Sequence, residues 1–273
     1  MGKIGGAKAI DALRLALVGN HAKGIEKDRP SVRYEAASAL GRTRDASAID
    51  ALSLALVGEI EKDELVSVRY AAASALGKIG DANAIDALSL ALVGNHTKGI
   101  KTDDSPSVRY AAASALGKIG DANAAHALSL ALVGNHAKGI EKDDCSCVRK
   151  AAASAFGEIG GANAGDALSL ALVGKRGNNI EKDEHDLVRG AAASSLGKIG
   201  DANAIDALSL ALVGNNAKGI EKDVGDLIHD LPASDLFMKF RRDEKIRVRK
   251  AVASALGKIG GADAINALSL ALV

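Results

Sequence analysis

The most reactive side chains of this sequence are two cysteines, Cys145 and Cys147, in the segment "DDCSC". Thiolates at this spacing, together with the preceding aspartates, are suitable ligands for a soft metal ion. However, the cysteines replace Ser105 and Ser107 of a nearly identical upstream segment, and the chain has no second cysteine pair. We therefore predict no metal site here, and two cysteines in 273 residues are too few for a disulfide framework.

Three of the six histidines recur at one position of a repeat, namely His21, His96 and His136. Copies in successive repeats are expected to lie roughly 10 Å apart, which is too far for two of them to share an ion. The other histidines and the cysteines are scattered along the chain, so they do not combine into an acid, a base and a nucleophile. We therefore predict that the chain is not an enzyme and binds no metal ion or cofactor.

The glycine-rich segments do not match nucleotide-binding motifs. In "GNHTKGIK" the second glycine is followed by Ile100 and Lys101 instead of Lys and then Ser or Thr. The "GKIGG" segments lack the dinucleotide-binding spacing and are predicted to end helices.

Composition restricts the class of partner. The chain has 35 basic and 34 acidic residues, a net charge of +1 that gives no general reason to bind nucleic acid. The opening "MGKIGG" lacks an export signal, and no apolar run approaches the ~18 residues of a membrane span, so we expect a cytoplasmic protein. Aromatic residues make up only 2% of the chain, so the core must consist of Ala, Leu, Ile and Val.

The reactive residues are embedded in a long internal repeat. The dipeptide "VR" recurs at Val32, Val68, Val108, Val148, Val188 and Val248, with spacings of 36, 40, 40, 40 and 60 residues. Residues 68–107 and 108–147 are identical at 32 of 40 positions. Periods near 40 residues without strand alternation are typical of helical solenoids.

Each repeat contains two predicted helices. In "VRYAAASALGKIG" the apolar residues after Val108 recur at steps of three and four, as on one face of a helix. We expect Gly117 and Gly120 to end this helix, Asp121 to cap the second one, and Gly134 to end that. Because two short helices cannot bury their apolar faces alone, the repeats must stack, which predicts an all-α fold of the α-solenoid class.

The segment "VRYAAASALGKIGDANAIDALSLAL" resembles the HEAT-like repeat of the phycobilisome-lyase type. The resemblance covers nearly the whole chain and implies a right-handed superhelix of about seven layers, forming a single domain over residues 1–273. The family contains bilin lyases, deoxyhypusine hydroxylase and plain binding scaffolds, so the fold does not settle the function. The hydroxylase binds iron through His-Glu pairs, and the sequence contains no His-Glu dipeptide, which excludes that activity.

Two features depart from the family pattern. The link "GNHTKGIKTDDSPS" is long, and we expect it to fold back so that Ile100 covers the apolar second helix; the alternative is a polar loop beside that helix. Residues 221–247 form an irregular insertion. Its residues 221–240 align with residues 181–200 as a decayed first helix, so we expect a bend or a protruding element there. Its Phe237 and Phe240 either fill a gap in the core or contribute to a partner-binding site.

The face of the first helix away from the core is predicted to bind the partner. Its first position is occupied by Tyr34, Tyr70 and Tyr110 in three repeats and by Lys150 in the next. Lys78 and Lys118 lie two turns further along the same face. Tyrosine is favoured in binding sites because its ring buries a large area at little entropic cost. The alternative is that these tyrosines simply pack against their helix neighbours.

An arginine follows the "VR" valine in every repeat, from Arg33 to Arg249. We expect these arginines to pair with Asp45, Asp81, Asp121 and Asp201 and so to tie the layers together, with an anion-binding row as the alternative.

The sequence starts within "GKIG" and stops at Val273 without a polar closing helix, although solenoids usually need caps. We expect Leu268, Leu270 and Leu272 to leave apolar surface exposed or to cover it by end-to-end self-association.

Together these patterns predict a non-enzymatic scaffold that binds another protein or peptide, and neither nucleic acid nor a membrane. A bilin-lyase-like or chromophore-handling role, implied by the family resemblance, is the alternative.

Overall fold

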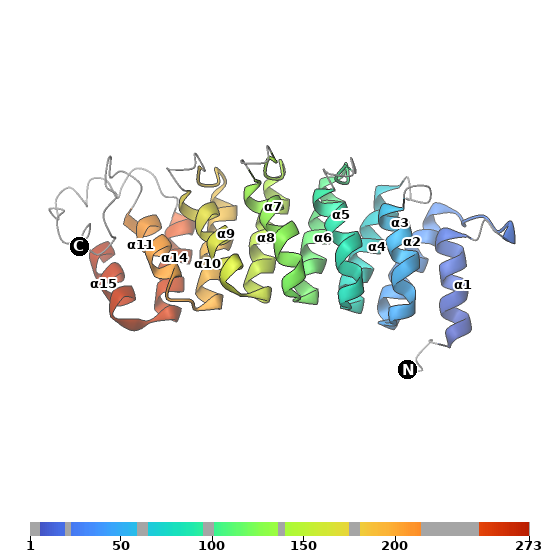
Figure 1. Ribbon diagram of the computed structural model, residues 1–273, viewed down its shortest axis with the longest axis horizontal. Coiled ribbons are helices and arrows are strands. Elements are labelled where there is room, and N and C mark those ends of the chain that lie inside the picture. Colours follow the sequence, from blue (N-terminus) through green and yellow to red (C-terminus); the bar gives the residue numbers. More distant parts are fainter. Residues whose placement is uncertain are drawn as a thin grey trace. The chain divides into compact units, whose positions relative to one another are not determined.

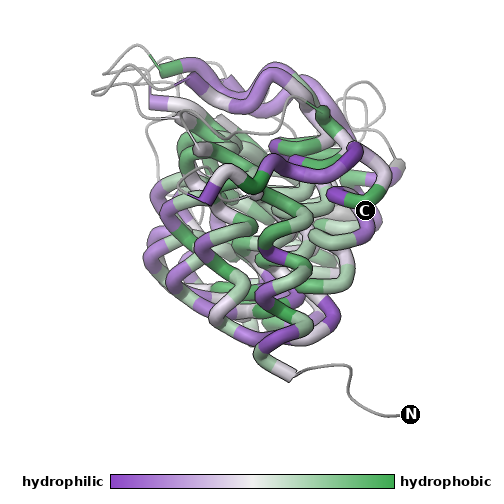
Figure 2. The backbone as a smooth tube through the Cα atoms, turned by 90° about the vertical axis from the view of Figure 1, so that its right-hand side faces the viewer, coloured by the Kyte–Doolittle hydropathy of each residue, from purple (hydrophilic) through white to green (hydrophobic). Residues whose placement is uncertain are grey.

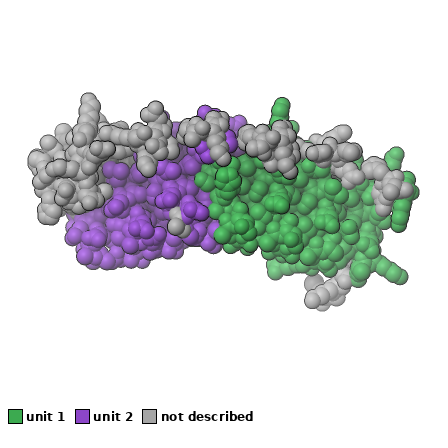
Figure 3. All heavy atoms as spheres, in the orientation of Figure 1, with its two compact units in different colours: residues 1–131 green, residues 132–273 purple. Residues whose placement is uncertain are grey.

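The computed structural model describes residues 6–19, 23–58, 65–94, 101–135, 140–174, 181–213 and 246–272. The chain divides into two compact units, residues 1–131 and 132–273 (Figure 3). The boundary falls inside helix α7 (Ala125–Val133). In the described part of the chain, no helix is long and apolar enough to cross a membrane.

Both units consist of helical hairpins (Figure 1). The first unit contains α1 (Ala7–Val18), α2 (Pro30–Thr43), α3 (Ile49–Val57), α4 (Val66–Ile79), α5 (Ile85–Val93) and α6 (Pro106–Ile119), with 3₁₀ turns at Ala46–Ala48, Ala82–Ala84 and Ala122–Ala124. The second unit contains α8 (Ser146–Ile159), α9 (Ala162–Val173), α10 (Asp186–Ile199), α11 (Ala204–Val213), α14 (Ile246–Ile259) and α15 (Gly261–Leu272).

Helices of one kind pack on helices of the same kind in the next repeat. The first helices form the series α2, α4, α6 and the series α8, α10, α14, while the second helices form α1, α3, α5 and α9, α11, α15. This arrangement confirms the predicted all-α solenoid of stacked hairpins within each unit. The handedness of the superhelix and the single domain over 1–273 stay predictions.

The core of the described residues is built mainly from alanine and leucine. In one repeat Val108, Ala112 and Leu116 of α6 are completely buried, and so is Leu128 of α7. Hydrophobic and hydrophilic residues alternate along the helices (Figure 2), as the periodicity of the sequence predicts.

Glycines inside the first helices allow the stacked helices to approach closely. A Cβ atom added to Gly77 would lie 2.7 Å from both Cα and Cβ of Ala115, and one added to Gly197 would lie 2.6 Å from Cα of Ala255. The prediction that Gly117 ends its helix is therefore wrong, since α6 continues to Ile119. The helix instead ends at Gly120, whose φ of 73° lies in the left-handed region.

The second helix of each regular hairpin begins at an aspartate, as predicted. The side chain of Asp121 accepts a hydrogen bond of 2.8 Å from the N–H of Asn123, and Asp81 does the same for Asn83 at 2.9 Å. A 3₁₀ turn of three residues separates each aspartate from the α-helix. These caps satisfy backbone N–H groups at the start of the second helix.

The long links return to the second helix of their own repeat. The N–H of Asp103 donates to the carbonyl of Ala91, and the N–H of Asp183 donates to that of Ala171, both at 2.9 Å. This agrees with the predicted fold-back, although Ile100 lies outside the described residues.

The stack continues across the irregular spacing between α10 and α14. These helices pack against each other, and the contact of Gly197 with Ala255 matches that of Gly77 with Ala115. The predicted bend is therefore not found between these two helices. Phe237, Phe240 and nearly all of residues 221–247 lie outside the described residues, while residues 246 and 247 begin α14.

At the C-terminal end, Leu268 is half-buried. The side chains of Leu270 and Leu272 lie outside the described part. The predicted end-to-end association stays a prediction.

Candidate functional site

Three tyrosines lie at one register of the first unit. Tyr34, Tyr70 and Tyr110 are each the fifth residue of their helices, α2, α4 and α6, and they are 38%, 39% and 43% exposed. Because α4 packs on both α2 and α6, neighbouring tyrosines are carried by helices roughly 9 Å apart. We call these three residues the tyrosine ridge.

The local sequence explains why the ridge faces solvent. In α6 the residues Val108 and Arg109 are buried, and Tyr110 is the next residue around the helix. One turn later Ser114 is half-buried, and two turns later Lys118 is exposed. The sequence therefore placed this face correctly, while its role in binding a partner stays a proposal.

The lysines of this face have different surroundings in the two units. Lys78 and Lys118 are exposed, about 12 Å along the helix from Tyr70 and Tyr110. In the second unit, Lys150 of α8 takes the place of the tyrosine and is exposed. Lys198, equivalent to Lys118, donates a 2.7 Å hydrogen bond to Glu158 on the neighbouring helix.

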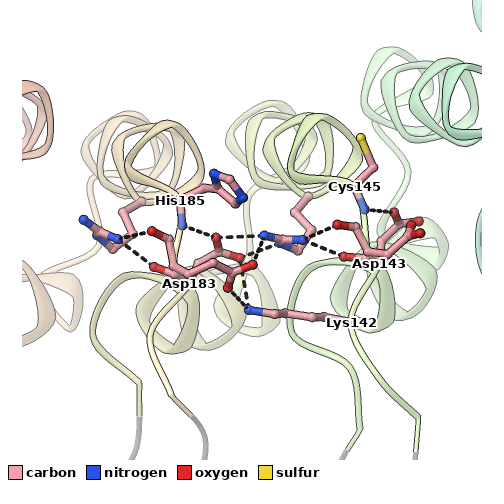
Figure 4. A network of polar contacts seen from close by, with 9 residues as sticks. Lys142, Asp143, Cys145, Asp183 and His185 are labelled. Atoms are coloured by element: carbon pink, nitrogen blue, oxygen red, sulfur yellow. Dashed lines mark hydrogen bonds and ion pairs between the residues drawn. The ribbon is translucent and has the colours of Figure 1, made fainter.

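A buried polar network joins α8 to the segment before α10 in the second unit (Figure 4). The guanidinium of Arg149 donates from Nε to Asp183 Oδ2 at 2.6 Å and from Nη2 to Glu184 Oε1 at 2.6 Å. Its Nη1 donates to the carbonyl oxygens of Asp143 and Asp144 at 2.7 and 3.1 Å. The side chains of Arg149 and Asp183 are both only 1% exposed.

The carboxyl side of this network has further donors. The N–H of His185 donates to Asp183 Oδ1 at 2.9 Å, and Arg189 donates from Nη1 to the Asp183 carbonyl at 2.7 Å. The Lys142 ammonium forms an ion pair with Glu184 and lies 3.6 Å from Asp183 Oδ2. The network thus connects the segment that leads into α10 with the start of α8.

The first unit contains the same interaction two repeat periods earlier. Arg69 donates from Nε to Asp103 Oδ2 at 2.7 Å and from Nη2 to Asp104 Oδ1 at 2.6 Å. Arg109 donates to the Asp103 carbonyl at 2.9 Å. Each of these arginines therefore stabilises the link that leads into a first helix.

The predicted pairing of the arginines with Asp45, Asp81, Asp121 and Asp201 is wrong. These aspartates instead accept hydrogen bonds from the backbone N–H groups of the turns that they begin. An arginine in the first turn of a helix lies about 18 Å from an aspartate that follows the end of the same helix, because twelve residues rise 1.5 Å each. The carboxylates that do bind the arginines belong to the links, at the same end of the helix as the arginine. They are Asp103, Asp104, Asp183 and Glu184, and the sequence analysis did not identify them.

The pKa shifts of Glu184 and Arg149 agree with the ion pairs of this network. Burial is the largest influence on Glu184 and raises its pKa, but the Lys142 hydrogen bond, a backbone hydrogen bond and the charges of Arg149 and Lys142 together lower that pKa to about 2. Burial also disfavours the charged form of Arg149, yet the bond to Asp183 and three nearby carboxylates raise its pKa above the ordinary value. Glu184 and Arg149 are therefore both held in their ionised forms near neutral pH.

Cys145 and Cys147 are joined by a disulfide at the start of α8. Among the described residues, no group of three or more His, Cys, Asp or Glu side chains is arranged to hold a metal ion. The histidines His21, His96 and His136 lie outside the described part.

Comparison with known families agrees with the repeat architecture. Residues 21–97 match the HEAT repeats family, and residues 108–134, 188–214 and 248–273 match the PBS lyase HEAT-like repeat. The stacked hairpins and these matches define an α-solenoid of HEAT-like repeats. The chain is a HEAT-like repeat protein of the PBS lyase type, as the sequence indicated.

The solved structures that are similar to this chain include a hydroxylase and a lyase complex. Human deoxyhypusine hydroxylase in complex with glycerol is 21% identical, with a TM-score of 0.36, covering 97% of this chain and 78% of its own. The complex of CpcE and CpcF of phycocyanin lyase from Nostoc sp. PCC7120 is 24% identical, with a TM-score of 0.49, covering 98% of this chain and 95% of its own. No curated protein matches the chain.

The prediction that the chain is not an enzyme is overturned by the family match. Three of its repeats are of the type named after PBS lyases, so the lyase class is the one to which the repeats point. The prediction rested on the absence of a recognisable set of unique catalytic residues, and such an absence does not exclude an enzyme.

Proposed function

We propose that this protein is a bilin-lyase-like protein that binds an open-chain tetrapyrrole on the tyrosine ridge and delivers it to an acceptor protein. The observation that supports this proposal most directly is the PBS lyase type of the repeats at residues 108–134, 188–214 and 248–273. A protein partner is part of the proposal because a lyase of this kind attaches its chromophore to a protein.

The chemistry of the ridge suits such a ligand. A bilin has an extended conjugated system, which stacks on aromatic rings, and propionate groups, which pair with cations. Tyr70 and Tyr110 offer rings on packed neighbouring helices, and Lys78 and Lys118 offer ammonium groups on the same face. The ridge runs across the helices, so an elongated molecule can contact several repeats at once.

The proposal is tested by titrating the full chain into phycocyanobilin and recording its absorption spectrum. We expect a saturable shift and sharpening of the visible band, because a bound bilin is held in an extended conformation. A spectrum unchanged at a large excess of protein contradicts the proposal.

The second half of the proposal concerns delivery. When the bilin-loaded protein is mixed with the apoprotein of a phycobiliprotein subunit, we expect covalently coloured acceptor after denaturing electrophoresis. The control is the same mixture without this protein. Equal colouring in both mixtures contradicts a lyase role and leaves bilin binding as the function.

A further inference from the structure

The disulfide between Cys145 and Cys147 is unusual in its place in the fold. The two cysteines are separated by one residue, with Cα atoms 5.3 Å apart, at the residues that begin α8. Cys147 is exposed and Cys145 is half-buried. One sulfur of the bond therefore belongs to a residue that solvent reaches.

The fold does not need this bond to begin the helix. The carbonyl of Cys145 accepts hydrogen bonds from the N–H groups of Val148 and Arg149, at 3.0 and 3.1 Å. The equivalent carbonyls of Ser105 and His185 accept the same pair of bonds at 3.1 Å, without any cysteine nearby. The helix start is thus identical in repeats that lack the bridge.

A disulfide between near neighbours also constrains the unfolded chain little. Its stabilising effect grows with the length of the loop that it closes, and this loop is about as short as a disulfide allows. Stabilisation of the fold is therefore a poor explanation for this disulfide. Thiolates at the first turn of a helix are favoured by the helix dipole, which is the environment of reactive cysteines.

We propose that Cys145 and Cys147 form a dithiol–disulfide redox site that exchanges electrons with small-molecule or protein dithiols. The exposed residue is the point of attack. Nothing in the proposed bilin binding uses either cysteine, so this inference does not depend on that function.

The exchange proceeds in two steps that balance. A donor thiolate attacks the sulfur of Cys147, a mixed disulfide forms, and Cys145 leaves as a thiolate. The second thiolate of the donor then attacks its own sulfur in the mixed disulfide, which releases Cys147 and the oxidised donor. Two electrons pass from the dithiol to the protein, and the released thiolates take up protons from solvent.

The site adjoins the buried network described above. The N–H of Cys145 donates to Asp143 Oδ1 at 2.9 Å, and the Asp143 carbonyl accepts from Arg149 at 2.7 Å. Figure 4 shows Cys145 beside Asp143 at one end of this network. The cysteine pair therefore lies next to the residues that anchor α8 to the following repeat.

The test is an equilibrium titration of the full native chain with dithiothreitol in graded redox buffers. After acid quenching and labelling with a maleimide, intact mass spectrometry counts the free thiols. We expect only unlabelled and doubly labelled protein, with complete native reduction and a common midpoint. Reduction that requires denaturant, or oxidation that yields disulfide-linked dimers instead of the internal bond, overturns the proposal.

Single variants test the assignment of the attacked sulfur. Cys145→Ser retains the exposed thiol and should accumulate a mixed disulfide with glutathione, at least tenfold faster than Cys147→Ser. The double variant C145S/C147S restores the residues of the preceding repeat and serves as the folding control, with unchanged helicity. Equal rates in the two single variants contradict the assignment.

Discussion

At the scale of single residues, the Arg149–Asp183 pair holds successive repeats of the second unit together. Both side chains are almost completely buried, so each ion has lost its hydration and depends on its partner. The surface pair of Lys198 and Glu158 also joins two neighbouring first helices, but its side chains are 51% and 60% exposed. The two pairs therefore differ in burial while joining the same two repeats.

We predict that Arg149→Ala destabilises the protein by about 3 kcal/mol, because it leaves the buried Asp183 carboxylate without its main partner. Lys198→Ala is the matched control and should change the free energy of unfolding by less than about 1 kcal/mol. Urea denaturation followed by circular dichroism measures both. Equal effects of the two substitutions would show that burial does not govern these pairs.

The loss of folding stability at acidic pH should depend on Glu184. Its pKa is lowered in the folded protein from 4.5 to about 2, so folding is favoured by its ionised form. This contribution is fully present above about pH 4.5 and is lost as the pH falls towards about 2. Because Glu184 is 57% exposed, solvent screening reduces the size of the effect.

The measurement is the midpoint of urea unfolding across that pH window, for the native chain and for Glu184→Gln. We expect the native chain to lose more stability than the variant as the pH falls. Parallel pH profiles for the two proteins would contradict the ionised contact.

At the scale of elements, the stacking of first helices depends on a glycine in the last turn. Gly197 faces Ala255 of the neighbouring helix so closely that a Cβ atom has no room. Gly257 occupies the same position in α14, and a Cβ atom added there meets nothing within 4 Å. The two glycines occupy the same position of their helices, but only Gly197 packs closely against a neighbouring helix.

We predict that Gly197→Ala destabilises the protein by about 1–3 kcal/mol through overpacking. Gly257→Ala should instead be neutral or stabilising by up to about 1 kcal/mol, since alanine is the better helix former. Thermal denaturation distinguishes the two signs. A stabilising Gly197→Ala would contradict the close helix contact.

The elements were predictable from the sequence because their signals are local. The periodicity after Val108 and the cap residue Asp121 specify the hairpin, and the copies repeat both signals. The role of Gly117 was not predictable in this way, because a glycine needed for packing resembles a glycine that ends a helix. The pairing of Arg149 with Asp183 spans 34 residues and depends on how the repeats stack.

At the scale of the whole molecule, the two units share one repeat but present different surfaces. The first position of the outer face is tyrosine in α2, α4 and α6, and it is lysine in α8 and α14. The repeated segment "ALSLALV" forms second helices whose alanines and leucines are largely buried. Function is therefore expected at positions where the copies differ, and the tyrosine ridge is the largest such difference.

The most direct test of the central claim compares bilin binding by the native chain and by the triple variant Tyr34→Ala, Tyr70→Ala and Tyr110→Ala. Aromatic anchors often contribute about 2 kcal/mol each, so we predict at least a tenfold loss of phycocyanobilin affinity in the absorption titration. Helicity and melting temperature should remain nearly unchanged, because the tyrosines are exposed. A variant that binds the bilin normally but melts several degrees lower would show that the tyrosines are packing residues and would contradict the account.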